Sequence, residues 1–281
     1  MIRAINAWTF PGKMTFEDCF EKAKEIGFEG IEFNMDAPVP EAGNHCFSCK
    51  STEEDFAKVR ELIKKYGIQV QSLACSTYWN KAMFGSNDPE KKNFAVEMLR
   101  DHIRCAKGVG AEAILVVPCL DRDIGLLENY NNTIATFREL EAEINESGIK
   151  IGLENVWNRF WSSPMDAKYV IDGIGNKNVG IYLDLGNMIV MNDAEWWVEV
   201  LADSIIKIHA KDYKRENGRY YTGDDCDLLE GDVNWDVVCP MLGKCYDGAI
   251  TAEPFCPPGQ DRNEFLKKIN KALEIIIAKT K

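Results

Sequence analysis

Residues 206–213 read IKIHAKDY, an apolar strand pattern that runs directly into ionisable residues. Ile206 and Ile208 alternate as in a buried β-strand, and His209 then opens a segment that also holds a lysine and an aspartate. The chain has only three histidines. A lone histidine is more often a hydrogen-bonded core residue, but one at the end of an apolar strand is also a candidate metal ligand.

Outward from this stretch, short apolar strands alternate with amphipathic helices along the whole chain. The alternation favours a parallel sheet covered by helices. Eight strand–helix units match a (β/α)8 TIM barrel, with residues 1–281 forming one domain. A doubly wound open sheet is the alternative, but no glycine-rich nucleotide-binding motif follows any strand. The strands are predicted at 2–8, 29–35, 68–75, 113–118, 150–155, 179–185, 205–211 and 248–254, and the helices at 15–27, 51–67, 88–110, 132–148, 163–175, 194–204, 234–245 and 262–280.

Capping residues mark the starts of the first three helices. Thr15 is a candidate N-cap of the first helix. Ser51 and Glu54 form a capping-box pattern before the second. Asp88 precedes Pro89 at the start of the third, which is the order expected of a cap and a first-turn proline.

Composition argues against several classes of partner. The net charge of −12 disfavours nucleic acid, whose binding depends on neutralising phosphates with Lys and Arg. No apolar run approaches the roughly 20 residues that cross a bilayer, and the N-terminus lacks the apolar region of a signal peptide. We expect a cytoplasmic protein with no membrane partner and reduced cysteines. Association into a homo-oligomer stays open.

The segment HCFSC at 45–49 contains one CxxC pair beside a histidine. A zinc knuckle needs a second pair at matching spacing, and the chain offers none. A loop that carries two ordinary thiols is therefore the favoured interpretation.

The last four predicted strands each end in a potential metal ligand. In a TIM barrel these ends meet at one mouth. Three carboxylates crowded there cannot all ionise without a compensating cation, so either some stay protonated or a metal lies among them, and we expect one divalent ion. The oxygen-rich donor set favours Mn²⁺, with Mg²⁺ or Co²⁺ also suitable and Zn²⁺ less well matched. A single acid at a strand end can instead cap the loop that follows it. The four residues are Glu154 in GLENVW, Asp184 in YLDLGN, His209 in IKIHAKDY and Glu253 in TAEPF.

Further residues near the strand ends are candidates for substrate contact. Lys211 lies two positions after His209, so it shares that strand face if the strand continues, although a surface lysine is the alternative. Asp212 is expected to orient the loop. Barrel phosphate sites often use the loop after the seventh strand, and here that loop, 211–219, carries four cations including Arg215. A solvated charged loop is the alternative.

Aromatic residues near other strand ends could wall the pocket and stack on a substrate, or could belong to the core. They are Trp8, Trp79 and Trp157.

The motifs GLENVW, YLDLGN, KIHAKDY and AITAEPF, in this order, resemble the sugar-phosphate isomerase/epimerase family with a xylose-isomerase-like TIM barrel. The resemblance implies a metal held by Glu154, Asp184, His209 and Glu253. It also implies that Glu154 and Glu253 act as base and acid on a ketose or ketose phosphate, moving a proton through a cis-enediolate that the metal stabilises.

Within the family, ENVWN and DLGN are most similar to the branch of ketopentose-5-phosphate 3-epimerases and hexulose-6-phosphate isomerases. Epimerases of free ketoses usually carry histidine where this chain has Asn187, and a further glutamate where this chain reads NRFW. These differences argue against a free ketose as the substrate. The expected substrate-binding residues are Trp8, Asn187, Lys211 and Arg215.

Other functions remain compatible with this scaffold. A lyase or dehydratase that acts on a keto-sugar or keto-inositol would use the same metal and base. A DNA-repair endonuclease with several zinc ions would need more histidine ligands than three and a basic face. A non-catalytic sugar-binding barrel would have no need of two opposed carboxylates.

Overall fold

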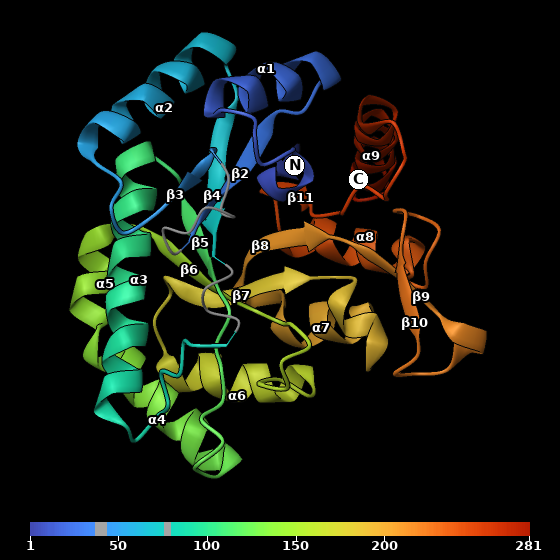
Figure 1. The fold of residues 1–281 in the computed structure, drawn as a ribbon. Coiled ribbons are helices and arrows are strands. Elements are labelled where there is room, and N and C mark those ends of the chain that lie inside the picture. Colours follow the sequence, from blue (N-terminus) through green and yellow to red (C-terminus); the bar gives the residue numbers. More distant parts are fainter. Residues whose placement is uncertain (37–43, 76–79) are drawn as a thin grey trace.

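The computed structural model describes residues 1–36, 44–75 and 80–281. Within them, eight parallel strands close into a barrel, because β1 pairs with both β2 and β11. Figure 1 shows the strands at the centre and the helices packed around them. The predicted (β/α)8 TIM barrel is thereby confirmed. The barrel strands are β1 (Ile2–Asn6), β2 (Gly30–Met35), β4 (Gln69–Ala74), β5 (Ala113–Val116), β6 (Lys150–Glu154), β7 (Val179–Asp184), β8 (Ile205–Ala210) and β11 (Ala249–Ala252).

The helices follow the strands in the order that the sequence predicts. A short strand, β3 (Cys46–Phe47), pairs with β2 outside the ring. The 3₁₀ turns η1 (Ala7–Thr9) and η4 (Asn187–Val190) follow β1 and β7. The helices are α1 (Phe16–Ile26), α2 (Glu53–Tyr66), α3 (Pro89–Val109), α4 (Leu126–Glu139), α5 (Glu141–Ser147), α6 (Pro164–Ile174), α7 (Ala194–Leu201), α8 (Trp235–Cys245) and α9 (Arg262–Ala278).

The capping prediction is right for α1 and α3 and wrong for α2. Thr15 forms a capping box with Asp18, and Asp88 accepts from the backbone of α3. At α2, however, the box joins Thr52 and Asp55, one residue later than predicted. Ser51 is not free for this role, because its hydroxyl accepts the backbone N–H of Ser48.

The single helix predicted at 132–148 is wrong, because two helices, α4 and α5, occupy this region. They are separated at Leu140, whose ψ of 3° lies outside the helical range and whose side chain is buried. α4 also begins earlier than predicted. The buried side chain of Asn129 hydrogen-bonds to the backbone of Asp121 and Gly125, which fixes the loop onto the first turn of α4. Apolar periodicity does not report such side-chain bonds.

The charged segment after β8 is a β-hairpin and not the loop that the sequence suggested. β9 (Asp212–Arg215) pairs antiparallel with β10 (Gly223–Cys226). In Figure 1 the hairpin lies outside the ring of barrel strands, beside α8. Asp212 fixes the base of the hairpin. Its carboxylate accepts hydrogen bonds from the backbone N–H groups of Tyr213, Leu229 and Val233 and from the indole N–H of Trp235. The expected loop-orienting role of Asp212 is thus observed.

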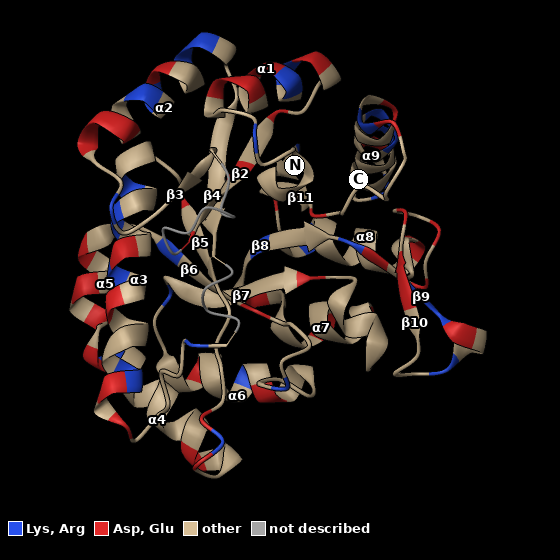
Figure 2. Cartoon of the chain, viewed as in Figure 1, with Lys and Arg blue, Asp and Glu red and all other residues tan. Residues whose placement is uncertain are grey.

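Acidic and basic residues are interspersed on the outer helices. Figure 2 shows both signs on α1, α2 and α3, whereas α5 carries acidic residues alone. In the described part of the chain, no helix is long and apolar enough to span a bilayer.

Candidate metal centre and active site

Four neighbouring strands bring the predicted ligands to one point. Glu154 ends β6, Asp184 ends β7, His209 is the next-to-last residue of β8, and Glu253 follows β11 directly. Asp184 and His209 are register partners in adjacent strands. Because parallel strands deliver their carboxyl ends to the same mouth, residues far apart in the chain become neighbours. We call Glu154, Asp184, His209 and Glu253 the quartet.

The spacing of the quartet suits a single metal ion. One ligand atom from each residue lies within 4.8 Å of the corresponding atoms of the others, and all four residues are buried. Oxygen and nitrogen ligands bind divalent ions at roughly 2.0–2.6 Å, so two ligands of one ion lie no more than about 5 Å apart. Among the described residues this is the one group of His, Cys, Asp and Glu side chains with such geometry.

Two buried atoms of the quartet support a metal more directly. Oδ1 of Asp184 accepts the backbone N–H groups of Gly186 and Asn187, both at 2.8 Å. Oδ2 of Asp184 and Nδ1 of His209 form no hydrogen bond among the described residues, and Oδ2 forms an ion pair with Nζ of Lys211 at 3.3 Å. A buried polar atom without a partner is costly, and a cation at the centre of the quartet would satisfy both atoms. The residues therefore fit a divalent metal.

Glu32, in the middle of β2, is hydrogen-bonded to His209 in the interior of the barrel. Its Oε1 lies 2.6 Å from Nε2 of His209, and both side chains are fully buried. Asn6, Ser72 and Tyr182 also donate to this carboxylate. Burial opposes the ionised form, but His209 and these donors lower the pKa of Glu32 to about 2. An ionised carboxylate only accepts, so Nε2 of His209 carries a proton and Nδ1 faces the quartet.

Sequence reasoning missed Glu32. Its signal was present, since a glutamate stands between Ile31 and Phe33 in a strand whose residues are all buried. A buried charge requires a partner, but the identity of that partner depends on how the barrel closes.

Asn155 was also missed by sequence reasoning. It clamps β6 to β7 by accepting the N–H of Asp184 at 2.7 Å and donating to the carbonyl of Asp184 at 2.8 Å.

The buried carboxylates of the quartet favour positive charge on the groups around them. Burial raises the pKa of Glu154 to about 7, and the carboxylates of Glu253 and Asp184 add to this effect. Burial alone would lower the pKa of His209, but Glu32 and Glu253 hold it well above its usual range. The pKa of Lys211 is also held well above its usual range by Asp184 and Glu253, against the effect of burial.

Three of the four predicted substrate-binding residues line one pocket together with two members of the quartet. Its volume is about 290 Å³, and Glu154 and Glu253 form part of its wall together with Trp8, Asn187 and Lys211. Nζ of Lys211 lies 2.8 Å from Glu253 and 3.3 Å from Asp184. We call this space the catalytic pocket.

Asn187 and Gly186 shape the catalytic pocket at the end of β7. The amide of Asn187 donates to Glu154 at 3.3 Å and accepts from Lys211 at 3.3 Å. A Cβ atom at Gly186 would lie 2.7 Å from the backbone carbonyl carbon of Lys211, so glycine is needed where these two segments pass each other. Asp225, from β10, adds an acid at the rim that sequence reasoning did not identify.

Arg215 is not brought to the quartet. Its guanidinium donates to the carbonyls of Ile189 and Asn192 and to the carboxylate of Asp193, and it stacks on Tyr220. These contacts fasten the hairpin to the segment after β7. They do not favour the substrate contact expected of Arg215, which stays a prediction.

The remaining predicted residues have different placements. Trp157 lines the catalytic pocket, whereas Trp79 lies outside the described residues. In the HCFSC segment, the ring nitrogens of His45 lie 2.9 and 3.2 Å from the carbonyl oxygens of Met14 and Ala7. The thiol of Cys46 also bonds to backbone carbonyls. The ordinary-loop interpretation fits these contacts better than a zinc knuckle.

Comparison with known proteins identifies the family. The family model described as xylose isomerase-like TIM barrel matches residues 20–276, and the chain belongs to this family. An uncharacterized protein of Methanocaldococcus jannaschii is 29% identical over 245 residues, covering 83% of this chain and 77% of that protein.

Two solved structures illustrate the shared fold. The IolI protein, crystallised with a zinc atom, is 18% identical with a TM-score of 0.81, over 100% of this chain and 99% of that one. A D-tagatose 3-epimerase-like protein is 22% identical with a TM-score of 0.76, over 100% of both chains. At these identities the likeness bears on the fold.

Proposed function

We propose that this protein is a divalent-metal-dependent isomerase or epimerase of a ketose or ketose phosphate. The observation that carries the proposal is the joint position of Glu154 and Glu253. Both belong to the quartet and both line the catalytic pocket. Epimerisation beside a carbonyl uses one group to remove a proton and a second group to return it to the opposite face, whereas isomerisation returns it to the adjacent carbon, and carboxyl groups can do either.

The chain supplies distinct surroundings for the two carboxyl groups. Glu154 is buried in the wall of the catalytic pocket, and without a cation burial raises its pKa to about 7, so it can exchange a proton near neutrality. Asn187 donates to Glu154 at 3.3 Å and so orients it. Glu253 lies 2.8 Å from the ammonium group of Lys211, which can also donate to a substrate oxygen. We propose that Glu154 and Glu253 exchange the proton through an enediolate.

The quartet would hold the metal, and we propose Mn²⁺ because of its three carboxylates and one imidazole. A bound divalent ion would act as a Lewis acid on the carbonyl and hydroxyl oxygens of the sugar. Trp8, Val117 and Phe255 line the same pocket. Their apolar faces would exclude water and pack on the C–H faces of a sugar.

Product analysis tests this function. The protein is loaded with Mn²⁺ and incubated separately with ketopentoses, ketohexoses and their phosphates, and the products are identified by NMR. The proposal predicts an epimeric ketose or the corresponding aldose of unchanged mass. Loss of water or of a leaving group would instead identify a lyase or dehydratase on the same scaffold.

A further inference from the structure

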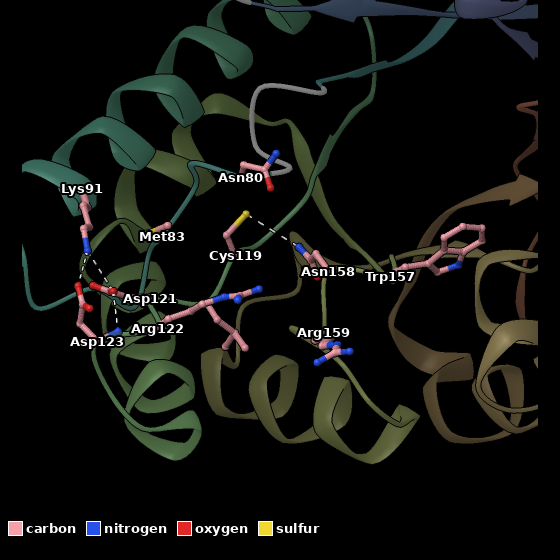
Figure 3. Close-up of a pocket in the computed structure, with 11 residues that line it drawn as sticks. Asn80, Met83, Lys91, Cys119, Asp121, Arg122, Asp123, Trp157, Asn158 and Arg159 are labelled. Carbon is pink, nitrogen blue, oxygen red and sulfur yellow. Dashed lines mark hydrogen bonds and ion pairs between the residues drawn. The ribbon is translucent and has the colours of Figure 1, made fainter. Parts of the chain in front are cut away.

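A second hollow lies beside the catalytic pocket at the same mouth of the barrel. Its volume is about 690 Å³, and its lining residues lie within 80–91, 119–123 and 157–159. Trp157 lines both this hollow and the catalytic pocket. A molecule whose reacting carbons lie at the quartet could therefore extend past Trp157 into the second hollow, which we call the side hollow. Figure 3 shows its lining.

Five charged residues line the side hollow, and their ion pairs leave a net positive charge in the lining. Lys91 donates to Asp121 at 3.1 Å and to Asp123 at 2.9 Å, so the two acids share one lysine. Arg122 and Arg159 complete the set, and both are exposed. Within the described part of the chain, neither arginine has an ion pair or a side-chain hydrogen bond. The lining thus holds three cations against two anions, whereas the whole chain has 33 basic and 45 acidic residues.

The loop that carries Arg159 is fixed on both sides of this residue. The amide of Asn158 donates to the carbonyl of Pro118 at 2.7 Å and accepts the N–H of Phe160 at 3.0 Å. Arg159 itself has a φ of 67°, a left-handed conformation that residues other than glycine rarely adopt. Arg122 lies on the loop after β5, and in Figure 3 it extends toward the loop of Asn158 and Arg159. Two guanidinium groups from different loops therefore border one cavity.

We propose that the side hollow is an anion-binding site in which Arg122 and Arg159 bind a phosphate or carboxylate group at the far end of the substrate. Guanidinium groups suit this role because each offers two parallel donors to the oxygens of one anion. The proposal rests on the proposed function for the sugar part of the ligand and goes beyond it by assigning the anionic group to these loops. It also explains how an acidic chain could accept an anionic sugar although Arg215 is engaged elsewhere.

A binding experiment tests the site without reference to activity. The metal-loaded protein is treated with phenylglyoxal, which modifies exposed arginines, with and without inorganic phosphate, and the modified peptides are quantified by mass spectrometry. Phosphate is expected to protect Arg122 and Arg159 but not Arg138, an exposed arginine of α4 that does not line the hollow. Equal modification of Arg122 and Arg159 in both samples would overturn the proposal.

A kinetic experiment tests the ligand class. The measured quantity is the ratio of kcat/KM for D-ribulose 5-phosphate to kcat/KM for free D-ribulose. In the double variant Arg122→Gln/Arg159→Gln this ratio should fall about tenfold for each arginine replaced. Arg138→Gln removes the same charge elsewhere and should leave the ratio unchanged. A ketohexuronate in place of the phosphate ester shows whether a carboxylate occupies the site. Melting temperatures confirm that the variants fold.

The two proposals fail in different ways. If phosphate protects Arg122 and Arg159 but no ketose is converted, the anion site stands and the proposed function is wrong. If ketoses are converted but the double variant has the same ratio of kcat/KM for charged and neutral ketoses as the wild type, the anion site is wrong and the proposed function stands.

Discussion

Oε1 of Glu32 lies 2.6 Å from Nε2 of His209, across 177 positions of sequence and in the interior of the barrel. The contact fixes which nitrogen of His209 faces Asp184, Glu154 and Glu253. It therefore links the second strand of the chain to a candidate metal centre whose residues come from the ends of the last four barrel strands.

Replacing Glu32 by Gln should weaken metal binding by about 10–100-fold, the usual effect of removing the partner of a metal-ligating histidine. The amide keeps the size of the side chain but no longer fixes the ring through an ionised acceptor. Metal affinity is measured by competition with a chelator. Ser72→Ala removes one donor to Glu32 without touching His209, so its effect should be smaller. Unchanged affinity in a folded Glu32→Gln protein would argue against this positioning role.

Replacing Asp184 by Asn should reduce the bound metal well below one ion per chain. Oδ1 can still accept from Gly186 and Asn187, but the group that replaces Oδ2 is an NH₂, which cannot bind a cation. Metal content is measured by elemental analysis after dialysis. Asp225→Asn makes the same change at the rim of the same pocket and should retain the metal. Equal metal content in the two variants would mean that the site is misassigned.

Replacing Arg215 by Ala should lower the free energy of unfolding by about 1–3 kcal/mol, because charge-assisted hydrogen bonds to Ile189, Asn192 and Asp193 are lost. Urea denaturation measures the change. Arg219→Ala, in the same hairpin, should have little effect, since the side chain of Arg219 is exposed and unbonded among the described residues. If Arg215→Ala leaves stability unchanged but raises KM only for phosphorylated sugars, Arg215 contacts the substrate after all.

The sequence was sufficient for the barrel and for the composition of the quartet. Strand–helix alternation reports local burial, and a parallel barrel then leaves one place for the strand ends that carry Glu154, Asp184, His209 and Glu253. The partner of His209 was not predictable, because it depends on how side chains cross the barrel interior. The contacts of Arg215 were not predictable for a similar reason, since its charge was visible but the carbonyls that accept its hydrogen bonds come from a different segment.

The central claim is that Glu154 and Glu253 move a proton on a carbon next to the sugar carbonyl. Its most direct test is deuterium uptake by a ketose incubated in D₂O with the Mn²⁺-loaded protein, followed by NMR and mass spectrometry. We predict uptake at that carbon in the wild type. Glu154→Gln and Glu253→Gln should each lower turnover by about 10²–10⁴-fold, and each variant should exchange, if at all, from only one of the two epimers. If metal-loaded Glu154→Gln and Glu253→Gln both retain near-normal turnover and exchange, the two-glutamate account is contradicted.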